Sequence, residues 1–64
     1  MEPLESLPKV GAPATRALNT AGYSRLGQLA HASRSELAAL HGVGPRAIRI
    51  LEESLKEHGL RLVD

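Results

Sequence analysis

The feature that most constrains the fold of this chain is an internal repeat. When the sequence is shifted by 33 residues, seven positions within a window of fifteen carry the same residue. The matched pairs are Leu4 and Leu37, Leu7 and Leu40, Val10 and Val43, Gly11 and Gly44, Ala14 and Ala47, Arg16 and Arg49, and Leu18 and Leu51. Leucines three residues apart, then a Val-Gly turn and a second apolar stretch, predict an αα-hairpin in each copy.

Length and composition narrow the class of protein. The chain has 64 residues, enough for one small domain, with little room for a catalytic cleft beside a core. Tyr23 is the only aromatic residue and cysteine is absent, whereas leucine and alanine are abundant. This composition favours helices, excludes disulfides and thiolate metal sites, and argues against binding of single strands by stacked bases. We expect a non-enzymatic, all-α protein with a single domain over residues 1–64.

Charge and hydropathy suggest where the protein acts. No apolar run is long enough to span a membrane, and the first residues are acidic, unlike those of a signal peptide. We therefore expect a cytoplasmic protein with no membrane partner. The net charge is +1, but six basic and only three acidic residues lie between residues 1 and 51. One face of the fold is expected to be locally positive.

Proline and glycine mark the ends of the predicted helices. Pro13 and Pro45 suit the first turn of a helix, and Gly22 and Gly59 suit the left-handed position after the last turn. Ser33-Arg34-Ser35-Glu36 matches a capping box, in which a hydroxyl and a carboxylate satisfy orphan amides. These boundaries predict one helical turn over residues 2–7 and helices over residues 13–21, 25–31, 34–41 and 45–58.

The last predicted helix has the clearest amphipathic pattern. Its apolar residues recur at spacings of three and four, which places them on one face toward the core: Ala47, Ile48, Leu51, Leu55 and His58. On the opposite side, Arg49 precedes Glu53 and Glu52 precedes Lys56 by four residues. We expect both pairs to form ion pairs worth about 0.2–0.5 kcal/mol each.

The second copy of the repeat carries a recognisable motif. Leu37-x-x-Leu40-His41-Gly42-Val43-Gly44-Pro45-Arg46-Ala47 resembles the helix-hairpin-helix motif, whose signature is a Gly-apolar-Gly turn with a small residue three positions later. Leu7-Pro8-Lys9-Val10-Gly11-Ala12-Pro13-Ala14 resembles a degenerate first hairpin, with Lys9 in place of the first glycine. Hairpins over 4–18 and 34–58, joined by a helix over 25–31, resemble the tandem, SAM-like form of this fold. The resemblance implies a compact bundle of four to five helices.

A second resemblance covers about three quarters of the chain. From Ala17 to Leu62 the spacing of glycines and leucines is similar to that in the C-terminal domain of the bacterial RNA polymerase α subunit. That domain contacts the DNA minor groove and activator proteins. This chain has Pro13 where the family has an arginine, with Arg16 one turn later as a substitute, and Gly42 where the family has an asparagine. The resemblance therefore implies binding to the DNA backbone without recognition of a promoter element.

Phosphate binding at such a turn has a physical basis of its own. Glycines lack a β-carbon, so a phosphate can approach the main chain, and the positive end of the following helix presents free N–H groups. Such contacts position a duplex without reading its sequence, so we expect non-specific binding to double-stranded DNA. The residues expected to contact DNA are Gly42, Val43, Gly44, Arg46, Ala47, Arg49, Lys9, Gly11 and Arg16.

Each of these features also has a purely structural interpretation. Glycine accommodates a positive φ with or without a ligand, and exposed arginines are usually solvated or paired. His41 is interpreted as a helix-end residue that caps carbonyls, with a phosphate contact as the alternative. A module that binds another protein through the same fold is the alternative function. We expect no metal, cofactor or small-molecule substrate, because the three histidines are scattered and no serine has a base and an acid at a recognisable spacing.

Overall fold

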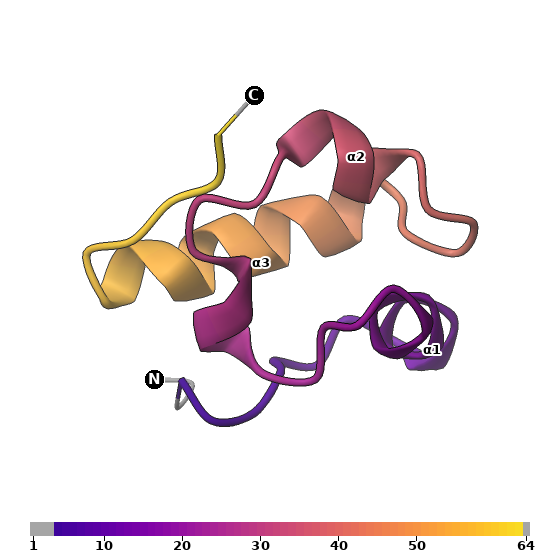
Figure 1. The fold of residues 1–64 in the computed structure, drawn as a ribbon, viewed down its shortest axis with the longest axis horizontal. Helices are drawn as coiled ribbons and strands as arrows, with labels where there is room; N and C mark the ends of the chain where they lie inside the picture. Colours follow the sequence, from indigo (N-terminus) through magenta and orange to yellow (C-terminus); the bar gives the residue numbers. More distant parts are fainter. Residues whose placement is uncertain (1–3, 64) are drawn as a thin grey trace.

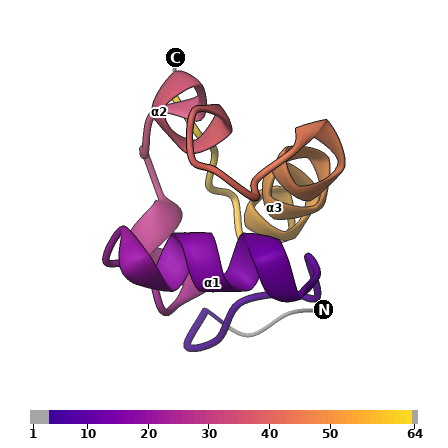
Figure 2. The same cartoon turned by 90° about the vertical axis from the view of Figure 1, so that its right-hand side faces the viewer.

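Helix α3 (Pro45–Glu57) is the element around which the rest of this computed structural model, which describes residues 4–63, is arranged. Helix α2 (Arg34–Ala38) and the 3-10 helix η1 (Leu26–Leu29) both pack against α3. Helix α1 (Ala12–Thr20) is seen end-on in Figure 1 and crosses below α2 and α3 in Figure 2. The described residues therefore form a small all-α fold, as the composition predicted.

The predicted number of helices was wrong. The described residues form three α-helices and one 3-10 helix, not a bundle of four to five helices. The predicted helix over 25–31 is the four-residue η1. Where one helical turn was predicted over residues 2–7, residues 4–6 form a turn. Residues 2 and 3 lie outside the described residues. A single turn gains few hydrogen bonds for the dihedral angles it fixes. Leu4 remains 38% exposed, so burial does not compensate for that cost.

The helix ends confirm most of the signals in the sequence. After α1, the N–H groups of Gly22 and Tyr23 donate to Asn19 O and Leu18 O at 3.0 and 2.8 Å. The same Schellman pattern, with Gly59 at the left-handed position, closes α3. Ser33 caps α2, because its hydroxyl accepts a hydrogen bond of 3.2 Å from the N–H of Glu36. Helix α2 ends at Ala38, about three residues earlier than predicted, where the chain enters the turn 39–44.

The core confirms the apolar pattern of the repeat. Two of the matched pairs share the same burial, because Ala14 and Ala47 are both buried and Leu18 and Leu51 are both fully buried, whereas Leu4 is exposed and its equivalent Leu37 is buried. The core also contains Leu26, Leu29, Leu37, Val43, Ile48, Leu55 and Leu62. Leucines therefore hold the two copies together across one shared interior.

The predicted ion pairs within α3 were wrong. In the described part of the chain, neither Arg49 with Glu53 nor Glu52 with Lys56 forms a pair; Glu52 pairs instead with Arg34 of α2. Because α2 packs on α3, Arg34 reaches Glu52 across the helix contact, and spacing along α3 does not reveal this partner. The exposed pair links α2 to α3 without contributing much to stability.

The C-terminal segment folds back onto the residues before α2, which no pattern in the sequence predicted. The N–H of His31 donates to Arg61 O at 2.9 Å, and the N–H of Val63 donates to Ala32 O at 2.8 Å. Ser33 and Val63 thus form an isolated parallel bridge immediately before α2.

Within residues 4–63, no helix has the length and apolar character needed to cross a bilayer.

Gly42 and Gly44 provide a matched test of this fold. Gly42 has a φ of +102°, and a β-carbon there would lie 2.8 Å from Pro13 O, whereas Gly44 has a φ of −103° and open space around it. We expect Gly42→Ala to lower the free energy of unfolding by about 2 kcal/mol or more, from left-handed strain and the clash. Gly44→Ala, the control, should change it by less than about 1 kcal/mol, because the lower unfolded-state entropy of alanine is opposed by its weaker N-cap preference. Urea denaturation followed by circular dichroism measures both, and equal effects would contradict the described turn.

Candidate nucleic-acid interface

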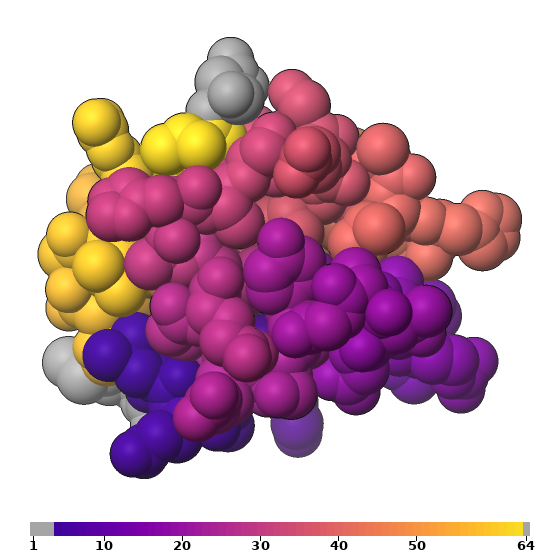
Figure 3. Space-filling model, viewed as in Figure 1, coloured from indigo at the N-terminus to yellow at the C-terminus, as the bar shows by residue number. Residues whose placement is uncertain are grey.

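The turn 39–44 lies directly against the first turn of α1. The ideal β-carbon position of Gly42 is 2.8 Å from Pro13 O and 3.6 Å from the Ala17 β-carbon, so the two segments are in van der Waals contact. In the space-filling view, α1 and this turn lie side by side on the right-hand part of the molecule (Figure 3). The start of the helix in the first copy of the repeat therefore adjoins the turn of the second copy.

The starts of α1 and α3 differ from the other two helix starts. The N–H groups of Leu26 and Gly27 in η1 donate to Ser6 O and Leu4 O, and Ser33 caps α2. Helices α1 and α3 begin after a glycine, have a proline in their first turn, and lack both a side-chain cap and an acidic residue in that turn. The first-turn amides of these two helices, those of Arg46 and Ala47 in α3 included, thus have no hydrogen-bond partner within their own helix.

Gly44 leaves the approach to α3 open. Its φ of −103° and ψ of −179° form an extended conformation that any residue adopts, and no atom lies within 4 Å of a β-carbon built there. Neither backbone strain nor packing therefore requires glycine at this position. By contrast, the positive φ of Gly42 and its contact with Pro13 explain why glycine is needed there, and its role in phosphate approach stays a prediction.

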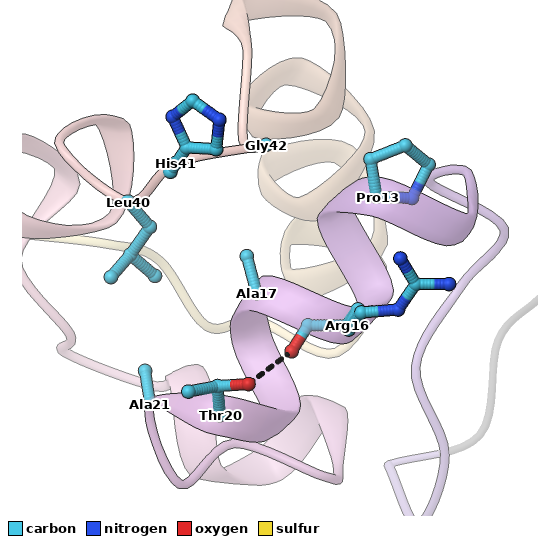
Figure 4. A pocket seen from close by; sticks show the side chains of 8 residues that line it. All are labelled: Pro13, Arg16, Ala17, Thr20, Ala21, Leu40, His41 and Gly42. Carbon is cyan, nitrogen blue, oxygen red and sulfur yellow. Dashed lines mark hydrogen bonds between the residues drawn. The ribbon is translucent and has the colours of Figure 1, made fainter.

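Two surface grooves flank the turn. The first, here the α1 groove, has a volume of about 380 Å³ and walls that include Pro13, Arg16, Ala17, Thr20, His41 and Gly42 (Figure 4). The second, the α2–α3 groove, has a volume of about 420 Å³ and walls that include Arg34, Ala38, Gly44, Pro45, Arg49 and Glu52. Arg16 and Arg49, which are equivalent in the repeat, thus stand in different grooves on either side of the turn.

The structure brings together most of the residues expected to contact DNA. Arg16, Arg46 and Arg49 are exposed and lie in the first half of α1 or α3. Val43 and Ala47 are only 6% and 5% exposed with their main chain included, so both residues belong to the core. Lys9 and Gly11 are exposed just before α1, but neither lines a groove beside the turn.

The two turns of the repeat do not share one conformation. In the second copy the left-handed residue is Gly42; the equivalent residue of the first copy, Lys9, does not have a positive φ. The left-handed residue there is Gly11, two positions later. A left-handed conformation costs an L-residue about 1–2 kcal/mol, so lysine at this position changes the turn. The first hairpin is therefore not a copy of the second, and only its helix start is equivalent.

His41 is the surface residue that the sequence interpretation assigned to the wrong role. Its imidazole makes no hydrogen bond within the described residues, so it does not cap the carbonyls of α2 as expected. Instead it lies exposed on the wall of the α1 groove (Figure 4). Its position next to Gly42, at the tip of a turn, is the sequence feature that could have predicted an exposed imidazole.

Residues 4–63 contain no group of three histidine or carboxylate side chains suited to a metal ion.

Comparison of the chain with protein-family models, with curated proteins and with solved structures finds no match in any of the three.

Gly44 also allows the open start of α3 to be tested. Aspartate is among the best N-cap residues, and the extended backbone of Gly44 suits it. We expect Gly44→Asp to raise the free energy of unfolding by about 0.5–1 kcal/mol, by capping α3 and by its charge at the positive helix end. Urea denaturation at low ionic strength measures this effect, and a loss of stability would show that the α3 amides already have a partner.

Proposed function

We propose that this chain is a variant tandem helix-hairpin-helix module that binds double-stranded DNA through its backbone phosphates, without reading the base sequence. The observation that carries this proposal is the pairing of two uncapped helix starts, those of α1 and α3, on one exposed part of the surface. Helix starts of this kind bind anions because the free amides and the helix dipole act in the same direction.

The start of α3 supplies the better of the two phosphate positions. An anion approaching Gly44 meets no side chain there, and the amides of Arg46 and Ala47 lie in the turn of helix that follows. Pro45 removes one donor but keeps the first turn preorganised. The side chains of Arg46 and Arg49 add charge on the same stretch of helix.

The start of α1 supplies a second position for phosphate. It also begins after a glycine without a side-chain cap, and Arg16 lies one turn into the helix. Because the turn 39–44 contacts Pro13, the two positions are held at a fixed separation. Two phosphates at a fixed spacing fit a duplex backbone better than a flexible single strand.

The departure from a regular tandem fold limits the contribution of the first hairpin. The segment before α1 has no helix in its described residues, and its turn places the left-handed residue at Gly11. In this proposal, one complete hairpin, α2 and α3, binds together with the start of α1. With few charges involved, we expect a Kd of about 10⁻⁴–10⁻⁶ M at physiological salt.

Fluorescence anisotropy with a labelled duplex tests the proposal. The logarithm of the binding constant should fall with the logarithm of salt concentration with a slope of about −3 to −4, for four phosphate contacts. Arg46→Gln should weaken binding and make this slope shallower by about 0.9. Gly44→Asp should weaken binding by about tenfold or more through repulsion of phosphate, although it stabilises the fold.

Arg61→Gln is the matched control. It removes the same charge from an exposed residue of the C-terminal segment, which pairs with the chain before α2, outside both grooves at the turn. Circular dichroism of each variant verifies the helices. Equal loss of binding for Arg46→Gln and Arg61→Gln would indicate a general charge effect and contradict a site at α3. Absence of duplex binding at low salt, with self-association of the chain instead, would favour the protein-interaction alternative.

A further inference from the structure

We propose that the α1 groove holds the sugar-phosphate backbone of one DNA strand, with Arg16 on one wall and His41 on the other, and that duplex binding is therefore linked to protonation of His41. This inference rests on the proposed function and assigns a role to a groove and a histidine that the two helix starts do not require.

The α1 groove has the charge that a phosphate backbone needs. Arg16 is the only permanently charged residue on its walls, and His41 is the only other titratable one. Its remaining walls are formed by Pro13, Ala17, Thr20, Ala21, Leu40 and Gly42, so no carboxylate opposes an anion. The Thr20 hydroxyl donates to Arg16 O at 2.9 Å and is already used.

Other surface grooves lack this combination. Glu5 lines the groove beside η1, and Glu52 lines the α2–α3 groove. The groove at the C-terminal segment contains Arg34 and Arg61, but Arg34 is paired with Glu52. In the described part of the chain, neither Arg16 nor His41 has an ion-pair partner, so both remain available to a ligand.

The two side chains come from elements that are fixed relative to each other. Figure 4 shows His41 on the turn side and Arg16 on the α1 side, with Ala17 between them. The Gly42 contact with Pro13 and Ala17 sets the width of this space. A strand that runs along the groove can thus contact one side chain on each wall.

The direction of the pH dependence follows from linkage. Histidine changes charge between about pH 5 and pH 8, and only the protonated imidazole attracts phosphate electrostatically. Binding of a phosphate next to His41 therefore takes up a proton, so duplex affinity rises as the pH falls through this range. Besides Arg16, no titratable side chain of α1 or of the turn 39–44 lines the groove with His41.

The experiment measures duplex affinity at about pH 5.5 and about pH 8, at constant ionic strength, for the wild type, His41→Asn and His31→Asn. His31 is the matched control because it lies outside the groove and has a φ of +64°, a conformation that asparagine tolerates. We expect the wild type and His31→Asn to bind about three- to fivefold more tightly at the lower pH. For His41→Asn, the ratio of the affinity at the lower pH to the affinity at the higher pH should fall to about one.

A second pair of variants tests the opposite wall. Arg16→Gln should weaken binding at both values of pH and make the salt slope shallower by about 0.9, whereas Arg25→Gln, on the exposed start of η1, should not. Helical content measured by circular dichroism verifies each fold.

The outcomes separate the two proposals. If the wild type fails to bind duplex at either pH, the proposed function fails and this inference falls with it. If duplex binds but His41→Asn keeps the wild-type pH ratio, the groove inference fails, while binding at the helix starts stands. If Arg16→Gln keeps the wild-type slope, both the groove and the phosphate position at the start of α1 fail, and only the position at the start of α3 stands.

Discussion

The contact between Gly42 and the first turn of α1 sets the geometry of the whole candidate interface. A β-carbon at position 42 would lie 2.8 Å from the Pro13 carbonyl oxygen, so only glycine lets the turn approach this closely. The same contact gives the α1 groove its width and holds the start of α1 beside the turn that leads into α3. The relative positions of the side chains at the candidate interface therefore depend on a main-chain contact between the two copies of the repeat.

Around this contact, the first-turn amides of some helices have hydrogen-bond partners from outside the helix, and those of other helices do not. The segment 4–6 supplies carbonyl oxygens to the start of η1, Ser33 caps α2, and the C-terminal segment hydrogen-bonds to residues just before α2. Such short helices are marginal alone, so these long-range contacts hold them in place. Among the helix starts of residues 4–63, those of α1 and α3 lack a side-chain cap and have no backbone partner from another segment like that of η1.

Leaving the start of α3 without a cap has an energetic cost. Glycine at an N-cap provides less stability than serine or aspartate, and at Gly44 the backbone would accept either. A small domain has little stability to spare. Neither strain nor packing requires glycine at this open end of α3, and Gly44 is where a phosphate would meet the main chain in the proposed function.

The sequence by itself determined the local features: the glycine caps after α1 and α3, the serine cap of α2, and the leucines that meet in the core. These depend on the preferences of a residue and its near neighbours, which spacing reveals. Only the tertiary structure decided that residues 25–31 shorten to η1, that Arg34 pairs with Glu52, that Gly42 contacts Pro13 while Gly44 stays open, and that His41 and Arg16 line the same groove. Each of these depends on residues far apart in the chain, whose proximity is fixed by how the helices pack.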